Sequence, residues 1–407
     1  MDIASSWRSG YTELNLMLQV SVLTRSGGVR YILLISQKKY FTIVYIQGDY
    51  SGGVNEPVIK HTVKQGETLF IIAQKYGISL SSLLAANPNI KNPSLIRPGQ
   101  VVNVPKAAPQ RTIVIPRESY GYNEMVSDLE TLRESYPFIK VDSIGTTVMG
   151  RSIPVVRIGQ GKKEVHYNGS FHANEWITTL LLMKFVEVYA KAYFSGKKIG
   201  TFNIKSLFDS VSLWVVPMVN PDGVQLVQGK IDTNSSTFAN ALRINRGSRD
   251  FSGWKANIRG VDLNDQFPAY WETEVSRRAS SGPSPRDYTG TEPLSEPEAR
   301  AMAEFTRAHN FRLVSAFHTQ GEEIYWGYRG LEPNESQQIV NRFIEVSGYE
   351  AVRYLESDAG YKDWFIQEWR RPGFTVECGH GINPLPISQF WEIWGKVIGI
   401  FLMGMYV

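Results

Sequence analysis

The sequence predicts an α/β fold for the larger, C-terminal part of the chain: a mixed, mostly parallel sheet flanked by helices. Strand-like apolar runs alternate there with longer segments of helical periodicity, and this alternation favours strands covered by helices on both faces. Ahead of this part, a short β-α-α-β pattern predicts a small module. The length of 407 residues exceeds the roughly 250–300 residues at which single cores stop growing, so we expect more than one domain.

The elements of the larger part follow from these runs. The predicted strands are SIPVVRIG, EVHYNGS, SLWVVPMV, RLVSAFHT and GFTVECG. The predicted helices are YNEMVSDLETLRESY, TTLLLMKFVEVYAKAY, SEPEARAMAEFTRAHN, NESQQIVNRFIEVSG and PISQFWEIWGKVIGIF. In such sheets, sites form at the carboxyl ends of the strands.

Composition narrows the class of protein. With 43% hydrophobic and 20% charged residues, the chain is expected to be globular. Its net charge of +4 comes without an arginine- or lysine-rich stripe, so we predict no nucleic-acid partner. The single cysteine, Cys378, excludes an intrachain disulfide and a cysteine-based zinc cluster.

The two ends of the sequence give no sign of a membrane. The N-terminal run MDIASSW lacks the positive charge of a signal peptide, so no secretory signal is expected. The last apolar run, VIGIFLMGMYV, is shorter than the about 20 residues that a membrane span needs, and it predicts a packed helix.

Four segments are predicted along the chain. Residues 1–57 are β-prone and hard to place; ISQKKYF faintly echoes IAQKYGI further on, which leaves open a degenerate copy of the next module. Residues 58–105 form that module, with VIKHTV and IRPGQVVNVP as strands around two short helices. Residues 106–119 form a linker rich in proline and alanine, and residues 120–407 form the α/β part.

The module at 58–105 resembles the LysM family of sugar-binding modules, through HTVKQGETLFIIAQKYGIS, LLAANPNI and IRPGQVVNVP. The resemblance implies binding of N-acetylglucosamine-containing glycan, in peptidoglycan or chitin. It places the sugar at two loops, with the contacts Gly66, Glu67, Thr68, Asn87, Pro88, Asn89 and Ile90. The alternative for these residues is ordinary capping and turn chemistry, and both roles stay open.

Four residues of the α/β part fall at or just after the ends of predicted strands: His172, Glu175, His318 and Glu377. A catalytic zinc ion takes three nitrogen or oxygen side chains and keeps one position open. His172 and Glu175 could chelate from one loop, and His318 would complete the set. The alternatives are a turn histidine, a first-turn helix carboxylate and a strand-end histidine, with Glu377 as the buried partner of a lysine.

Seven stretches resemble the zinc carboxypeptidase family, of the carboxypeptidase A type: GSFHANEW, VPMVNPDGV, LRINR, RGVDLNDQFP, YTGTEPLSEPEAR, AFHTQGEEIYWG and FTVECGHG. The resemblance implies a mixed eight-stranded sheet and one zinc ion held by His172, Glu175 and His318. It implies that Glu377 is the general base and that Arg246 stabilises the oxyanion. The alternative for Arg246 is a surface ion pair.

The sequence departs from this family where a terminal carboxylate would be held. Asn264 is kept, but Asp265 stands where the family has arginine, and an aspartate there would repel a carboxylate. The family's mobile tyrosine is displaced, with Tyr354 next to its position, and Lys362 takes the side-chain pocket. We hypothesise that Asp265 binds the ammonium of diaminopimelate and that Lys362 binds its carboxylate. The alternative for Lys362 is a solvated lysine at the start of a helix.

HTQGEEIYW and GVDLNDQF are similar to a subgroup of this family, the γ-D-glutamyl-meso-diaminopimelate peptidases of spore-forming bacteria. This implies hydrolysis of peptidoglycan stem peptides, in the cytoplasm of a sporulating cell or at the wall. One alternative is a carboxypeptidase acting on peptide C-termini, with Tyr354 and Arg249 replacing the clamp. The other is a non-catalytic glycan-binding protein.

Overall fold

A computed structural model describes residues 17–25, 28–37, 40–46 and 58–407, apart from 77, 79, 91, 94 and 106–111. The chain separates into two units, residues 1–57 and 58–407. The described part of the first unit is a three-stranded antiparallel sheet of β1 (Met17–Arg25), β2 (Gly28–Gln37) and β3 (Tyr40–Ile46). The stretch ISQKKYF, which echoes part of the next module, includes the end of β2 and the start of β3.

The second unit begins with the predicted β-α-α-β arrangement. β4 (Val58–Thr62) pairs antiparallel with β5 (Val101–Pro105), and α1 (Leu69–Tyr76) and α2 (Leu80–Ala85) lie between them in sequence. The Thr68 hydroxyl accepts a hydrogen bond from the amide of Ile71 at 3.2 Å, which caps the start of α1. The predicted module is confirmed in its order of elements.

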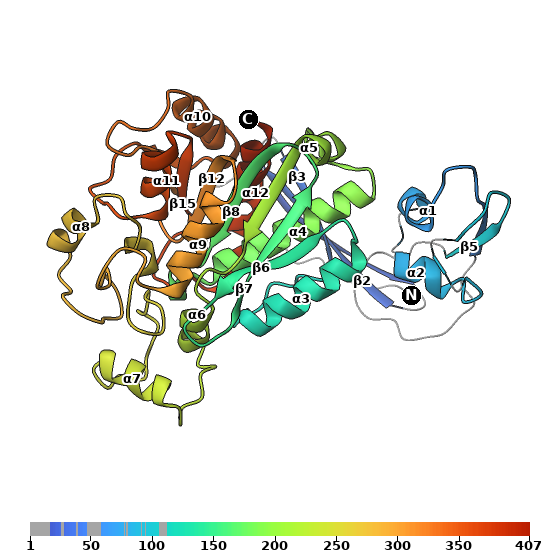
Figure 1. Ribbon diagram of the computed structural model, residues 1–407. Coiled ribbons are helices and arrows are strands. Elements are labelled where there is room, and N and C mark those ends of the chain that lie inside the picture. Colours follow the sequence, from blue (N-terminus) through green and yellow to red (C-terminus); the bar gives the residue numbers. More distant parts are fainter. Residues whose placement is uncertain are drawn as a thin grey trace. The chain divides into compact units, whose positions relative to one another are not determined.

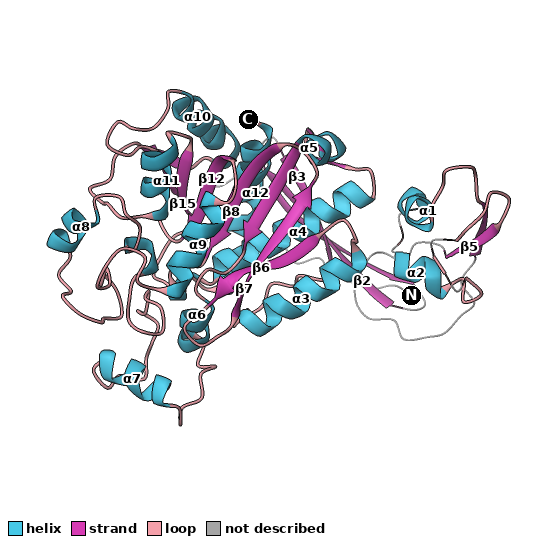
Figure 2. Ribbon diagram, viewed as in Figure 1, coloured by secondary structure: helices cyan, strands magenta, loops and turns pink. Residues whose placement is uncertain are grey.

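The rest of the unit is built on an eight-stranded mixed sheet with the order β14-β13-β15-β12-β8-β11-β7-β6 (Figures 1 and 2). β8 pairs parallel with both β11 and β12, and β12 pairs parallel with β15, so the centre of the sheet is parallel. The two sides carry antiparallel pairs, β11 with β7 and β15 with β13. The strands are β6 (Lys140–Thr146), β7 (Ser152–Gly159), β8 (Lys163–Gly169), β11 (Val211–Val216), β12 (Phe311–His318), β13 (Glu323–Tyr325), β14 (Glu350–Val352) and β15 (Gly373–Glu377).

Helices cover both faces of this sheet because each central strand sends alternate apolar side chains to opposite sides. On β7, Val156 and Ile158 belong to one core cluster, and Ile153 and Val155 belong to the other. The first core also takes side chains from α3 (Tyr122–Ser135), α4 (Ile177–Phe194), α10 (Glu335–Ser347) and α12 (Phe390–Tyr406). The second takes them from α9 (Pro297–Arg307) and α11 (Tyr361–Trp369).

The predicted strands and long helices are confirmed, and shorter elements join them. These are β9 (Lys198–Ile199), β10 (Phe202–Asn203), α5 (Ile204–Ser210), α6 (Pro221–Val227), α7 (Ser236–Ile244), α8 (Trp271–Arg277), and the 3-10 turns η1 (Ala173–Glu175), η2 (Leu263–Asp265) and η3 (Ile387–Gln389). The C-terminal run packs as α12, with Val397, Ile400 and Phe401 buried. Within the described residues, no helix is long and apolar enough to cross a bilayer.

Candidate active site

The carboxyl ends of three neighbouring strands bring the predicted residues together. His318 is the last residue of β12 and Glu377 the last of β15, and the two are paired in the parallel register. β8 ends at Gly169, which is paired with Phe317, so the turn that carries His172 and Glu175 starts beside His318.

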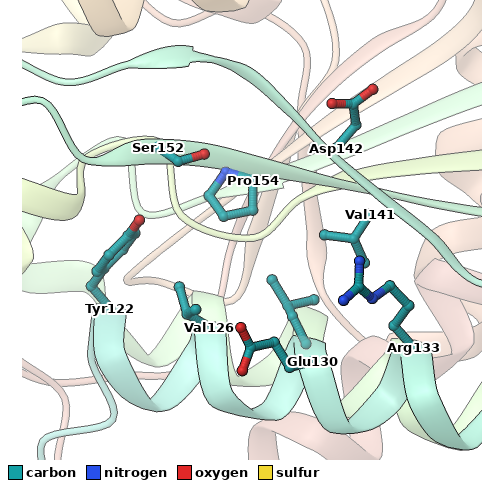
Figure 3. Close-up of a pocket in the computed structure, with 9 residues that line it drawn as sticks. Tyr122, Val126, Glu130, Arg133, Val141, Asp142, Ser152 and Pro154 are labelled. Atoms are coloured by element: carbon teal, nitrogen blue, oxygen red, sulfur yellow. The ribbon is translucent and has the colours of Figure 1, made fainter.

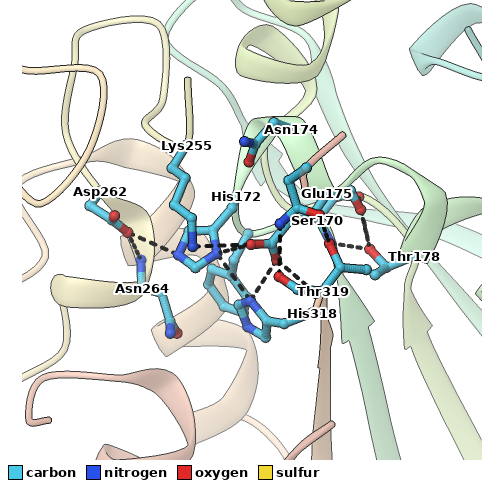
Figure 4. Close-up of polar contacts among 12 residues, drawn as sticks. Ser170, His172, Asn174, Glu175, Thr178, Lys255, Asp262, Asn264, His318 and Thr319 are labelled. Atoms are coloured by element: carbon cyan, nitrogen blue, oxygen red, sulfur yellow. Dashed lines mark hydrogen bonds and ion pairs between the residues drawn. The ribbon is translucent and has the colours of Figure 1, made fainter. Parts of the chain in front are cut away.

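His172, Glu175 and His318 form a compact cluster of ligand atoms, all within 4.8 Å of one another (Figure 4). The Nδ1 atoms of the two histidines are 3.2 Å apart. Glu175 Oε1 lies 2.8 Å from His172 Nδ1, and Oε2 lies 3.0 Å from His318 Nδ1. Tetrahedral zinc with bonds of about 2.0–2.1 Å separates its ligand atoms by roughly 3.3 Å, so this donor set fits such an ion.

A contact between Asp262 and Nε2 of His172 determines that Nδ1 is the nitrogen free to bind a metal ion. Nε2 of His172 lies 3.2 Å from Oδ1 of Asp262, which is 3% exposed. A carboxylate in this place holds the proton on Nε2 and leaves Nδ1 as the lone-pair donor. Although burial raises the pKa of Asp262, its contact with His172 brings that pKa well below the ordinary value. Burial lowers the pKa of His318, which keeps this imidazole neutral and able to ligate.

Two further groups surround Glu175, which is 1% exposed. The amide of Thr319 donates to its Oε2 at 3.2 Å, and the ammonium of Lys255 lies 3.3 Å from its Oε1 (Figure 4). Lys255 lies in a loop and is partly exposed. The site thus contains a lysine that the sequence did not single out.

Glu377 has the acidity that a general base near neutral pH needs. Burial and the charge of the nearby Glu175 raise the pKa of Glu377 to about 8. A base is most effective when its pKa is close to the working pH.

Arg246 lies on the loop after α7, with a left-handed backbone (φ 54°) and an exposed side chain. Among the contacts of the described residues, none joins Arg246 to the metal cluster. Arg249 on the same loop is also exposed, with its guanidinium 5.6 Å from the centre of the Phe238 ring.

The predicted substrate residues are engaged within the protein. Asn264 Oδ1 accepts from the amide of Tyr361 at 3.2 Å. Tyr354 is 53% exposed and its hydroxyl donates to Glu332 at 3.2 Å. Lys362 is 8% exposed, and its ammonium donates to the Gly327 carbonyl at 2.8 Å and pairs with Asp363. The idea that Lys362 is solvated is wrong, and its charge is already neutralised.

Asp265, expected to repel a substrate carboxylate, already has a cationic partner within the protein. It is 3% exposed, and its Oδ1 lies 2.7 Å from Nη2 of Arg278, directly after α8. The repulsion expected of this aspartate is therefore offset by an arginine from another segment.

The predicted glycan contacts divide into two groups. Gly66, Thr68, Pro88 and Asn89 are exposed. Asn87 is 2% exposed, and its side chain bonds to the backbone of Leu83 and Asn103, which is the structural alternative. Glu67 accepts from the amide of Lys64 at 2.8 Å and contacts His61 at 2.7 Å, and Ile90 is half-buried.

A separate pocket of about 220 Å³ lies between α3 and the strands β6 and β7 (Figure 3). Its lining residues are Tyr122, Val126, Leu129, Glu130, Arg133, Val141, Asp142, Ser152 and Pro154. None of the lining residues belongs to the metal cluster, so this pocket is not part of the candidate active site.

Asp262, Lys255 and Arg278 are the residues that sequence reasoning missed. Asp262 stands two residues before Asn264 in GVDLND, so a search for a carboxylate partner of a ligating histidine could have found it. Lys255 and Arg278 lie outside strands and helices and had no such signal.

Comparison with known proteins agrees with this geometry. Residues 61–105 match the LysM domain. The chain is 51% identical over 295 residues to γ-D-glutamyl-L-diamino acid endopeptidase 1 of Lysinibacillus sphaericus, covering 72% of this chain and 74% of the relative. It is 38% identical over 357 residues to the uncharacterized protein YqgT of Bacillus subtilis (strain 168), covering 82% and 95%.

Among solved structures, bovine thrombin-activatable fibrinolysis inhibitor, in complex with tick carboxypeptidase inhibitor, shares the fold. The TM-score is 0.56 at 20% identity, covering 72% of this chain and 97% of that chain. The profile of the zinc carboxypeptidase family matches residues 125–392, which is more than half of the chain. The chain therefore belongs to the zinc carboxypeptidase family and carries a LysM domain ahead of its peptidase domain.

Proposed function

We propose that the protein is a zinc peptidase that hydrolyses the amide between the γ-carboxyl of D-glutamate and meso-diaminopimelate in peptidoglycan stem peptides. The observation that carries the proposal is the 51% identity to a γ-D-glutamyl-L-diamino acid endopeptidase across most of both chains. The replacement of the clamp arginine by Asp265, which is buried and paired, also separates this chain from carboxypeptidases that hold a free C-terminus.

In this proposal His172, Glu175 and His318 hold one zinc ion per chain, with Asp262 orienting His172. When bound, zinc supplies Lewis acidity and makes water acidic enough to serve as the nucleophile near neutral pH. Glu377 accepts the proton of the attacking water and passes it to the leaving amine of diaminopimelate. The family resemblance assigns to Arg246 the positive charge that the carbonyl oxygen needs as negative charge develops there, and Lys255, 3.3 Å from Glu175 Oε1, is a second cation already at the cluster.

The LysM domain is proposed to hold the enzyme on N-acetylglucosamine-containing glycan, through the exposed Gly66, Thr68, Pro88 and Asn89. Tethering raises the local concentration of stem peptides at the peptidase site without any new contact in that site. The proposed divisions are 58–105 for this domain, 106–119 for the linker and 120–407 for the peptidase. The proposed setting is a sporulating bacterial cell.

Mass spectrometry of purified tri- and tetrapeptide stems after incubation tests the activity. We expect L-Ala-D-Glu together with diaminopimelate or its D-alanine derivative. Release of only D-alanine from the tetrapeptide would support the carboxypeptidase alternative instead. A chelator is expected to abolish turnover and added zinc to restore it, and full activity of metal-free protein would overturn the proposal.

A further inference from the structure

An arginine outside the recognisable motifs neutralises the aspartate that replaces the family's clamp. Nη2 of Arg278 lies 2.7 Å from Oδ1 of Asp265, which is 3% exposed. A buried carboxylate is costly unless a cation compensates it. Among the ion pairs of the described residues, Arg278 is the cation that contacts Asp265.

Short contacts connect this arginine with the metal cluster. Nη1 of Arg278 lies 3.3 Å from Oδ1 of Asp287. The amide of Asp287 donates to Oδ2 of Asp262 at 3.4 Å. Asp262 Oδ1 in turn lies 3.2 Å from Nε2 of His172. The guanidinium of Arg278 is therefore linked to Asp262, the residue that precedes the 3-10 turn η2 and orients the ligand His172.

Arg278 keeps N–H donors for a further acceptor. A guanidinium has five N–H donors. In Arg278, each of the three nitrogens lies beside one acidic group: Nη2 beside Asp265, Nη1 beside Asp287, and Nε at 2.7 Å from Oε1 of Glu274. Glu274 also pairs with Arg277, and Asp287 pairs with Arg286, so these two acids are compensated by other arginines. The Arg278 side chain is 28% exposed, whereas that of Asp265 is 4% exposed.

Two other cations, Lys362 and Arg329, are also held by the protein, and neither of them contacts Asp265. Lys362 is buried against the Gly327 carbonyl and Asp363. Arg329 is held by both oxygens of Asp358, at 2.8 and 2.9 Å. A planar, partly exposed guanidinium with unused donors is the group that recognises a carboxylate.

We propose that Arg278, held in place by Asp265, binds a carboxylate of the diamino acid on the leaving-group side of the scissile amide. This inference rests on the proposed function and names a specificity residue for it. The carboxylate has two sources in the substrate: the α-carboxylate next to the scissile nitrogen, and the distal carboxylate of the diaminopimelate side chain.

The test pairs protein variants with substrates that lack one carboxylate each. Wild type, Arg278→Gln and Arg278→Lys are assayed on L-Ala-γ-D-Glu-meso-diaminopimelate. The same variants are assayed on this tripeptide with its α-carboxyl amidated, and on the lysine tripeptide, which lacks the distal carboxylate. Arg278→Gln is expected to lower kcat/KM about 10- to 100-fold on the first substrate, mainly through KM.

This loss is expected to disappear on the one substrate that lacks the bound carboxylate, because the interaction is already missing there. Arg278→Lys is expected to recover part of the loss, since it keeps the charge but not the fork of donors. Arg277→Gln is the matched control: it is the neighbouring arginine, with a 31% exposed side chain, and it pairs with Glu274 and Asp358 but not with Asp265. It is expected to show no preference among the three substrates.

If Arg278→Gln fails to fold because Asp265 is left unpaired, the double variant Asp265→Asn/Arg278→Gln replaces it, since that variant removes both charges. Equal losses on all three substrates, or no loss on any, would overturn the role of Arg278 while leaving the proposed function intact. Failure of the wild type to cleave every stem peptide would overturn the proposed function instead.

Discussion

Asp262 orients His172: its Oδ1 lies 3.2 Å from the Nε2 atom of that imidazole, while the Nδ1 atom faces Glu175 and His318. Because the carboxylate keeps the proton on Nε2, the lone pair of Nδ1 is free to bind the metal. Loss of such a carboxylate partner typically lowers metal affinity about 10- to 100-fold. We therefore expect Asp262→Asn to weaken zinc binding by that factor. Competition with a chromophoric chelator measures it.

The control for this substitution is Asp209→Asn, which removes an exposed carboxylate paired with Lys205. It is expected to leave zinc affinity unchanged. Equal zinc affinity in Asp262→Asn and wild type would contradict the role assigned to Asp262.

Glu377 is the predicted general base, and its buried carboxylate is expected to lower the stability of the fold. We expect Glu377→Gln to lower kcat about 100- to 10,000-fold, because the amide cannot accept the proton of the attacking water. Since burial raises the pKa of Glu377 to about 8, the amide replaces a carboxylate that is unfavourable to ionise. The unfolding temperature is thus expected to stay the same or rise.

Steady-state kinetics and calorimetry on the same zinc-loaded sample check both halves of this prediction. A variant that keeps full activity would rule out Glu377 as the base. A variant that is inactive but also loses its zinc would show damage to the metal cluster instead.

His166, a buried residue of β8, is expected to make the fold sensitive to acid. Nδ1 donates to the Trp214 carbonyl at 3.1 Å and Nε2 accepts from the Asn168 amide at 3.1 Å, so the neutral ring is satisfied on both sides. Burial lowers the pKa of His166 to about 3, against 6.5 ordinarily. The unfolded chain therefore binds the extra proton first as pH falls.

It follows that His166 lowers stability progressively from about pH 6.5 toward pH 3, and has little effect above pH 7. Urea unfolding at several pH values measures this. His166→Phe is expected to flatten the slope of the free energy of unfolding against pH in this window. An unchanged slope would contradict the prediction, whatever the absolute stability of the variant.

Lys362 and Asp363 form a buried ion pair, so we expect a structural role for this lysine. Lys362→Met leaves Asp363 buried without its cation and is expected to cost about 3–5 kcal/mol of unfolding free energy. Lys362→Met/Asp363→Asn is expected to cost less, since no unpaired charge remains. Thermal or urea unfolding compares the two.

A different result would support the hypothesis that Lys362 binds the carboxylate of diaminopimelate. In that case Lys362→Met would keep its stability and lose the preference for diaminopimelate over lysine peptides.

The central strands could be predicted because both of their faces are buried. β12 is mostly apolar, and β8 alternates apolar Val165 and Tyr167 with polar residues, so each carries a recognisable strand pattern. β6 lies at the edge of the sheet and alternates mostly between exposed and half-buried residues, and β13 and β14 have three residues each. Such strands carry too little apolar pattern to be recognised.

The metal cluster could be predicted, and the surroundings of Asp265 could not. His318 ends β12, and His172 and Glu175 lie in the turn after β8, so the strand pattern places all three at the carboxyl ends of neighbouring strands. Arg278 follows α8, in which Glu274 is the single buried residue, so the helix has no apolar stripe and its position depends on tertiary contacts. The charge of Asp265 was visible in the sequence, but its partner was not.

The two imidazoles of the metal cluster are 146 positions apart along the chain and meet through the pairing of β12 with β8. A nascent polypeptide thus lacks a complete chelating pocket until its central sheet has closed, long after His172 has left the ribosome. Binding of the ion would therefore follow formation of the central sheet, because a chain that ends before β12 offers His172 and Glu175 but not His318.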